Sequence, residues 1–357
     1  MTMLGLDPRA ARIAWTVAVV AILLYVVFVI RKTLFVFALA LFLGYMIGPL
    51  VNLLDRYRPR RLPQGASVVA AFTLVIGIVV TGIALLGPVI STEAANLMEQ
   101  LPKLAQRADA ANPLPLPRAL ESIRAPLEAV LRQSLAGATG SAIPFVRRVG
   151  ETIVRLAGNL PLLVLIPILA FFFVKDGTDI RSALLQRIKT ASTRNVVSEA
   201  LVDIDAALGQ YVRALGVLAL ATLVAYAAFF TATGVPYAFL LAAIAAVLEF
   251  IPLLGPLAAA VIALVVAGVA GYDHLIWIAA FIAVYRGFQD YVLSPKLMSG
   301  GADVHPALII FGFLAGEELA GIPGMFLSVP VIAILVILGK VMLREKRTNT
   351  QGPPRTG

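Results

Sequence analysis

Cysteine is absent from this chain, and its 357 residues include only two histidines. Disulfides, thiolate catalysis and zinc–thiolate sites are therefore excluded. His274 and His305 do not have the His-Glu-x-x-His spacing of zinc hydrolases. The sequence also contains no Gly-x-Ser-x-Gly elbow and no Gly-x-x-x-x-Gly-Lys-Ser/Thr phosphate loop. We therefore expect a protein that is not an enzyme and that uses no cofactor and no metal site.

Charged residues are also scarce: they make up 14% of the chain, whereas a soluble domain usually has about 25%. Hydrophobic residues make up 60%, and they form solid runs instead of the alternating pattern of an outer-membrane β-barrel. The sequence therefore predicts an all-α polytopic membrane protein. The lengths of the apolar runs indicate about eight transmembrane helices.

The formal net charge of +9 is concentrated beside apolar runs. Four arginines lie from Arg56 to Arg61, and five basic residues lie from Lys340 to Arg355. Basic residues that flank membrane spans mark the cytoplasmic side, so this placement favours contact with the lipid bilayer over nucleic acid. It predicts a multi-pass membrane protein with both termini in the cytoplasm. The Arg31-Lys32 pair, on the outer side, is a minor exception.

Changes in composition divide the chain into six segments. Residues 1–90 contain three apolar runs, which predict transmembrane helices 1–3. Residues 91–150 mix charges, apolar residues and prolines, which is typical of short amphipathic helices outside the membrane. The remaining segments are transmembrane helix 4 at residues 151–174, a cytoplasmic amphipathic helical segment at 175–205, a transport-type membrane region at 206–340, and a basic disordered tail at 341–357.

The longest charge-free stretch covers 35 residues, from 214 to 248, and ends at Glu249. One crossing of a bilayer takes about 20 residues, so this stretch is long enough to cross more than once. Two prolines and a glycine follow the acid, and they should break the helix between apolar halves at residues 237–251 and 257–270. These halves are short, and they could span the membrane or re-enter it. Broken backbone and a carboxylate are both unfavourable in lipid, so their combination indicates a site.

Two later groups of charges are further candidates. Asp290 and Lys296 bracket Pro295, which is expected to end the preceding helix, so the two charges could pair across a turn. Glu317 and Glu318 lie in a glycine-rich stretch, and at most one of two adjacent acids can easily face a cavity. For each charge the alternative is a position at a helix end, in contact with headgroups or water. The residues that we expect to line a substrate or ion pathway are Glu249, Pro252, Gly255, Pro256, Asp290, Pro295, Lys296, Glu317 and Glu318.

Several proline- and glycine-rich strings occur in a fixed order. They are Phe171-Phe172-Phe173-Val174-Lys175-Asp176-Gly177, Gly234-Val235-Pro236-Tyr237-Ala238, Phe250-Ile251-Pro252-Leu253-Leu254-Gly255-Pro256, Pro295-Lys296-Leu297-Met298-Ser299-Gly300 followed by His305-Pro306, and Gly321-Ile322-Pro323-Gly324-Met325-Phe326-Leu327-Ser328-Val329-Pro330. Together they resemble the autoinducer-2 exporter (AI-2E) family over about residues 10–340. Glu317-Glu318, where the family often has small residues, and Arg286 just before Asp290 are departures from its pattern.

The resemblance implies eight transmembrane segments, an extracytoplasmic insertion after the third, and a homo-oligomer, with a pentamer as the candidate form. It also implies export of a small polar solute, either an autoinducer-2-like signal molecule or a related metabolite.

Together with the broken helices, this favours a secondary transporter coupled to a proton or sodium gradient. The alternatives are a cation/proton antiporter, a passive channel, or a non-transporting scaffold in envelope assembly that uses residues 91–150.

Overall fold

The computed structural model describes residues 8–59, 62–63, 65–109, 160–252, 254–297 and 305–350. These parts of the chain are built of helices, and no strand occurs in them. The helices are α1 (Pro8–Val29), α2 (Arg31–Tyr57), α3 (Ala66–Asp109), α5 (Leu160–Gln186), α6 (Ala191–Thr233), α7 (Ala238–Leu248), α8 (Leu254–Val269), α9 (Leu275–Phe288), the π-helix η2 (Gln289–Leu293), α10 (Ser294–Leu297), α11 (Pro306–Ala320) and α12 (Ile322–Thr350). Most of the predicted outer segment, at residues 110–150, lies outside the described residues, as do the first part of predicted helix 4 and the end of the tail.

Length and composition make five of these helices long and apolar enough to cross a membrane: α1, α2, α3, α6 and α12. Helices α7 and α8 are apolar but shorter. The prediction of a helical multi-pass membrane protein is confirmed. The total of eight crossings, and the choice between spanning and re-entrant halves, stay predictions.

Two of the helices are much longer than a membrane is thick. Helix α3 has 44 residues and α6 has 43, which at 1.5 Å per residue gives about 65 Å for each, against a hydrocarbon layer of about 30 Å. Helix α3 therefore continues from its apolar run into the segment that is expected to lie outside the membrane. Helix α6 joins the amphipathic segment predicted at residues 175–205 to the membrane region predicted from residue 206, without a break.

The end of α6 is set by its turn chemistry. Gly234 has a φ of 71°, in the left-handed region that glycine adopts without strain, and Pro236 follows it. Tyr237 also has a positive φ, of 60°, directly before α7 begins. This turn sends α7 back along α6.

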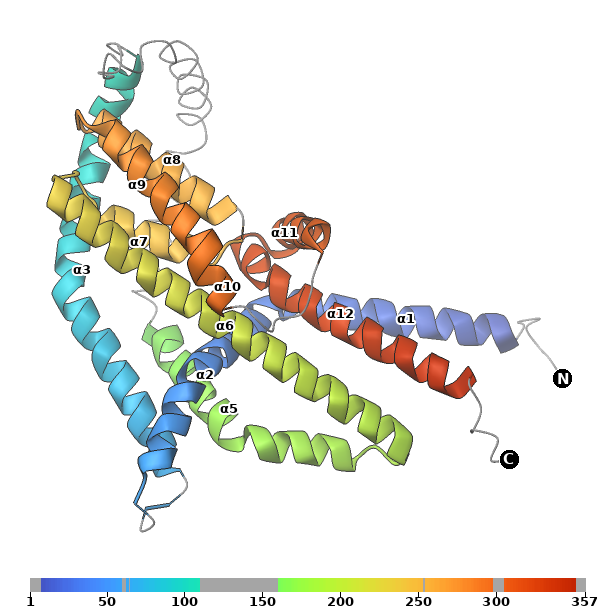
Figure 1. Ribbon diagram of the computed structural model, residues 1–357. Helices are drawn as coiled ribbons and strands as arrows, with labels where there is room; N and C mark the ends of the chain where they lie inside the picture. Colours follow the sequence, from blue (N-terminus) through green and yellow to red (C-terminus); the bar gives the residue numbers. More distant parts are fainter. Residues whose placement is uncertain are drawn as a thin grey trace.

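Helix α7 lies at the centre of the largest hydrophobic core. Figure 1 shows it between α3 and α6, with α8 and α9 nearby. Eight of its eleven residues are buried. Side chains from several other helices pack with them, among them Leu97 of α3, Phe230 of α6, Ile262 of α8 and Ile278 of α9. A short helix that is apolar on all sides is expected to be buried, and α7 is buried here.

The first half of the described chain forms a second core. Helices α2, α3 and α5 pack around Ile47 and Phe72, which are both buried. Helices α11 and α12 form a tight pair near the carboxyl end (Figure 1).

Candidate functional site

The position of the site follows from the pairing of α6 with α7. Helix α7 has eleven residues, and Thr222 lies eleven residues before the end of α6 at Thr233. Because the two helices are antiparallel neighbours, the residue after α7 returns to the level of Thr222. That residue is Glu249, and Thr222 Oγ1 donates a hydrogen bond to its Oε2 at 3.3 Å.

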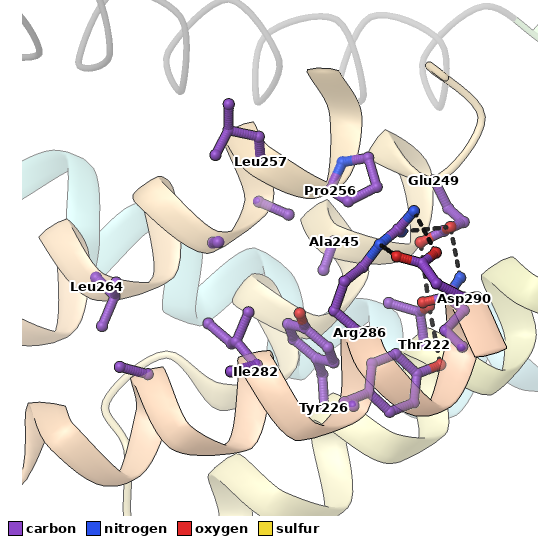
Figure 2. A pocket seen from close by; sticks show the side chains of 16 residues that line it. Thr222, Tyr226, Ala245, Glu249, Pro256, Leu257, Leu264, Ile282, Arg286 and Asp290 are labelled. Carbon is purple, nitrogen blue, oxygen red and sulfur yellow. Dashed lines mark hydrogen bonds and ion pairs between the residues drawn. The ribbon is translucent and has the colours of Figure 1, made fainter. Parts of the chain in front are cut away.

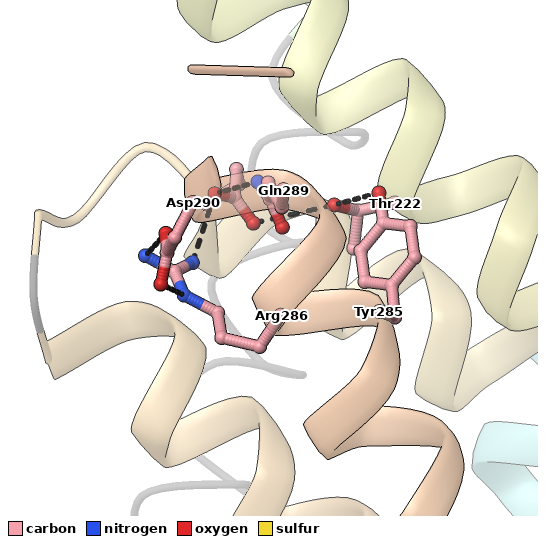
Figure 3. Close-up of polar contacts among 6 residues, drawn as sticks. Thr222, Tyr285, Arg286, Gln289 and Asp290 are labelled. Carbon is pink, nitrogen blue, oxygen red and sulfur yellow. Dashed lines mark hydrogen bonds and ion pairs between the residues drawn. The ribbon is translucent and has the colours of Figure 1, made fainter. Parts of the chain in front are cut away.

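Glu249 is 8% exposed and is contacted by polar groups from two other helical segments. Gln289 Nε2 donates a hydrogen bond of 2.5 Å to its Oε1. The Nη1 atom of Arg286 lies 3.6 Å from the same oxygen, as an ion pair. The Thr222 hydroxyl also pairs with the hydroxyl of Tyr285 at 3.1 Å, and either group can be the donor (Figure 3). Both carboxylate oxygens are therefore satisfied, although the side chain is buried.

Arg286 is shared between two acids. Its Nε atom lies 2.9 Å from Asp290 Oδ2 and its Nη2 atom lies 2.8 Å from Asp290 Oδ1, a bidentate pair between residues four apart on one helix. Lys296, the cation that the sequence suggested for Asp290, is exposed on α10 and is not in this contact. The pairing that we expected across a turn is replaced by pairing along the helix.

The prediction that the helix ends at Pro295 is wrong. The chain stays helical from Leu275 to Leu297, through the π-helix at Gln289–Leu293. A proline ring clashes with the α-helical carbonyl four residues before it, and here that residue, Tyr291, lies in the wider π-turn. Two side chains of the site, Gln289 and Asp290, come from the same π-turn, and such turns are frequent at functional sites.

These side chains line one end of a cavity of about 440 Å³. Figure 2 shows Glu249, Arg286 and Asp290 grouped at this end, with Tyr226 and the apolar wall beyond them. The cavity is lined by Thr222, Tyr226, Ala245, Glu249, Pro256, Leu257, Ala259, Ala260, Leu264, Ala279, Ile282, Ala283, Tyr285, Arg286, Gln289 and Asp290. A largely apolar pocket with a few convergent polar groups is the usual form of a small-molecule site.

Aromatic packing between α6 and α9 fixes one wall of this cavity. The rings of Phe229 and Phe281 stack with their centroids 4.0 Å apart. Tyr226 meets Phe281 and Tyr285 edge to face at 5.2 and 5.5 Å. Such contacts hold the two helices at a fixed distance, because each ring has few alternative packings.

Three of the nine residues that we expected along a pathway line this cavity: Glu249, Pro256 and Asp290. Pro252 lies in the break between α7 and α8, and Gly255 lies in the first turn of α8. A side chain at Gly255 would overlap the Leu248 carbonyl oxygen, so the close return of the chain there requires glycine.

The other four expected residues lie elsewhere. Pro295 and Lys296 are exposed on α10, and Glu317 and Glu318 are exposed on α11. The glycines beside the two acids serve a different purpose. A side chain on Gly316 would meet the backbone of Gly324, and the reverse also holds, so they allow α11 and α12 to touch.

Sequence reasoning missed Thr222, Tyr226, Tyr285 and Gln289 as site residues, and it treated Arg286 only as a departure from the family pattern. Arg286 and Asp290 have a four-residue spacing that predicts a shared helix face. Thr222 is separated from its partners by long stretches of sequence, and only the antiparallel return of α7 brings it to Glu249.

Metal-binding residues are not clustered in the described ranges: no three residues of the types His, Cys, Asp and Glu are close enough there to hold a metal ion together. The polar groups at the cavity are two carboxylates, one guanidinium, one amide and hydroxyls. This set can bind protons and hydrogen-bonding solutes.

Comparison with known proteins shows which sequences the chain is similar to. The sequence profile described as "AI-2E family transporter" matches residues 17–344. "Putative transport protein YrrI" of Bacillus subtilis is 26% identical over 327 residues, which is 88% of each chain. YueF of B. subtilis is 25% identical, covering 93% of this chain and 95% of its own. MT0215 of Mycobacterium tuberculosis is 30% identical, covering 85% of this chain and 82% of its own. YueF and MT0215 also have names of the form "Putative transport protein". The chain therefore belongs to the AI-2E family of transporters.

Proposed function

We propose that the protein is a secondary transporter that moves a small polar solute through the Glu249 cavity, coupled to an ion gradient. The observation that carries this proposal is a buried carboxylate that faces a cavity, at a helix break directly after the longest charge-free stretch of the chain. Intramembrane acids and interrupted helices both mark pathways in membrane transporters.

The depth of the site supports the proposal. Helix α6 has no charge from residue 214 to its end at Thr233, which is 20 residues or about 30 Å, the thickness of the hydrocarbon layer. Thr222 lies near the middle of this stretch, so Glu249 beside it lies near the bilayer midplane. Secondary transporters bind their substrates at this depth.

The ends of the α7–α8 hairpin support a re-entrant arrangement. Helix α7 leaves the end of α6, and the hydroxyl of Tyr272, just after α8, donates a hydrogen bond of 3.1 Å to the Thr233 carbonyl oxygen. Both ends of the hairpin therefore lie at one level, with Glu249 at its tip. Under the orientation that the basic residues predict, the hairpin enters from the extracytoplasmic face of the bacterial cytoplasmic membrane and both termini are cytoplasmic.

Burial of an ionised carboxylate at this depth is unfavourable unless partners compensate for lost water. The partners of Glu249 are arranged to do so, but they leave its environment polar and open to a cavity. A scaffold helix has no need of this arrangement, because an apolar residue at the same position would pack without compensation.

Transport from vesicles of defined content tests the proposal. Purified protein is inserted in vesicles that contain small metabolites extracted from a bacterial cytosol, and a proton or sodium gradient is imposed. Mass spectrometry of the external medium should detect at least one small polar solute that leaves only when protein and gradient are both present. If protein-free vesicles release the solute equally fast, the protein does not carry it. If release needs no gradient and does not saturate with solute concentration, the protein is not a carrier.

The scaffold alternative depends on residues 91–150, of which 110–150 lie outside the described part of the chain. It stays a prediction, and deletion of residues 105–135 separates the two ideas: a scaffold loses its partner, whereas a transporter keeps its flux. The homo-oligomer is likewise a proposal, and a particle-mass measurement in detergent tests it.

A further inference from the structure

We propose that Arg286 excludes metal cations from Glu249, so that the ion taken up at this carboxylate is a proton. The inference deepens the proposed function and rests on it for its role in coupling. The contacts themselves stand on the geometry of the site.

Each polar contact to Glu249 in the described structure presents a hydrogen-bond donor to it. The donors are the amide nitrogen of Gln289, the hydroxyl of Thr222 and the guanidinium of Arg286. Hard metal cations require several oxygen ligands at short distance. The amide of Gln289 can turn to offer its oxygen, but arginine has only donors and keeps its charge. Arg286 therefore cannot become a metal ligand by any rotation of its side chain, because it has no acceptor atom.

Charge acts in the same direction as ligand chemistry. The Nη1 atom of Arg286 is 3.6 Å from Glu249 Oε1, and this atom is buried without a hydrogen-bond partner of its own among the described residues. A metal ion bound to Oε1 would lie close to a positive charge in a medium of low dielectric, where repulsion is weakly screened. The same charge also opposes protonation of Glu249, but a proton forms a covalent bond with one oxygen and needs no shell of ligands. Ligand chemistry therefore separates the proton from a metal ion at this site.

The second oxygen of Glu249 is suited to a proton. Its partner Thr222 is a hydroxyl, which can donate or accept, and Thr222 in turn pairs with the hydroxyl of Tyr285 in a contact of either direction. When Oε2 is protonated, the acid can donate to Thr222, and the Thr222 hydroxyl can donate to Tyr285. Tyr285 lines the cavity, so this chain of hydroxyls connects Oε2 with the space where a proton would arrive.

The other groups that face Glu249 fit this arrangement. Helix α9 and η2 contribute Tyr285, Arg286 and Asp290, and α6 contributes Thr222 and Tyr226, while the cavity residues of α8 carry no charge. Asp290 holds Arg286 with both of its oxygens and is half exposed, so it acts as a positioning residue. Without Arg286, two carboxylates would face each other across open space, which is a set of ligands for a cation.

Infrared difference spectroscopy of the purified full-length protein tests the inference without knowledge of the solute. The carboxylic-acid band of Glu249 is identified by its loss in Glu249→Gln and its retention in Glu99→Gln, an exposed acid of α3. Its amplitude at fixed pH is then compared in sodium chloride and in choline chloride at equal ionic strength. In the wild type the two amplitudes should agree. In Arg286→Gln sodium should lower the amplitude at least about twofold, by mass action.

Two results would overturn the inference: displacement of the proton by sodium in the wild type, or a folded Arg286→Gln protein that ignores sodium. If Arg286→Gln does not fold, Arg286→Met takes its place. Arg286→Lys keeps a positive charge and offers only donors, so its acid band should also be equal in sodium chloride and in choline chloride. Competition by sodium in the wild type would leave the transporter proposal standing. Absence of any solute flux would remove that proposal but leave the sodium result unchanged.

Discussion

Glu93 of α3 accepts a hydrogen bond from the backbone N–H of Leu240 in α7, with 2.7 Å between Oε2 and N. Leu240 lies in the first turn of α7, and Tyr237, the residue before that helix, provides no side-chain cap of its own. The free N–H groups of a helix start need an acceptor, and a carboxylate there also complements the helix dipole. Helix α3 therefore supplies the cap of the helix whose other end presents Glu249.

Loss of this cap should loosen the start of α7. Glu93→Ala should lower the free energy of unfolding by about 1–2 kcal/mol, as other cap deletions do, and should speed hydrogen exchange at Leu240. Glu93→Gln keeps an acceptor oxygen and should have a smaller effect. Thermal unfolding in detergent and amide exchange measure both changes. Glu99→Ala, on an exposed side chain of the same helix, is the control, and an equal loss in that variant would argue against a cap.

The hairpin tip should not tolerate a side chain at Gly255. A methyl group there overlaps the backbone of Leu248, so Gly255→Ala forces the break between α7 and α8 to open, at a cost of about 1–3 kcal/mol. Gly287→Ala is the matched control, because a side chain at Gly287 meets nothing within 4 Å and alanine favours the helix. Unfolding curves of the two variants measure this difference in stability. A Gly255→Ala protein as stable as the wild type would show that Gly255 does not lie so close to the backbone of Leu248.

Thr222 should be needed for its hydroxyl. Thr222→Val has nearly the same shape but leaves Oε2 of buried Glu249 without its hydrogen-bond donor. A hydrogen bond to a charged group contributes about 1.5–3 kcal/mol of stabilising free energy, and this contribution would be lost. Gradient-driven solute release should fall in this variant and persist in Thr222→Ser. The reverse order of the two activities would place the role of Thr222 in its methyl group and not in its hydroxyl.

Asp290 should act through Arg286. In Asp290→Asn the guanidinium loses its bidentate partner and is free to turn fully to Glu249, which would hold that carboxylate in its ionised form. We expect a weaker infrared acid band of Glu249 at a given pH, together with slower transport. Asp273→Asn, at an exposed position before α9, should change neither quantity. An unchanged acid band in Asp290→Asn would show that Asp290 does not influence the protonation of Glu249.

Local sequence signals predicted the parts of this site that depend on local chemistry. Glu249 was found because a charge ends a long apolar run, and the break after it was found because proline and glycine interrupt helices. The continuation of the helix through Pro295 was not found. The π-turn before it comes from a shift of backbone hydrogen bonds that leaves no composition signal.

Partners that meet through packing were beyond sequence reasoning. Thr222, Glu249 and Gln289 come from separate helices, and their contact depends on the return of α7 along α6 and on the position of α9. Glu317 and Glu318 show the opposite case: beside glycines they looked like site residues, yet those glycines serve the contact of α11 with α12. Glycine marks close approach, and only the fold shows what approaches.

The most direct test of the central claim compares three proteins in vesicles that hold the same mixture of small metabolites under the same proton gradient. Glu249→Gln keeps the size of the side chain but cannot take up or release a proton, so it should abolish gradient-driven solute release. The wild type and Glu99→Gln should release the solute at equal rates. Release from Glu249→Gln at the wild-type rate would contradict the account.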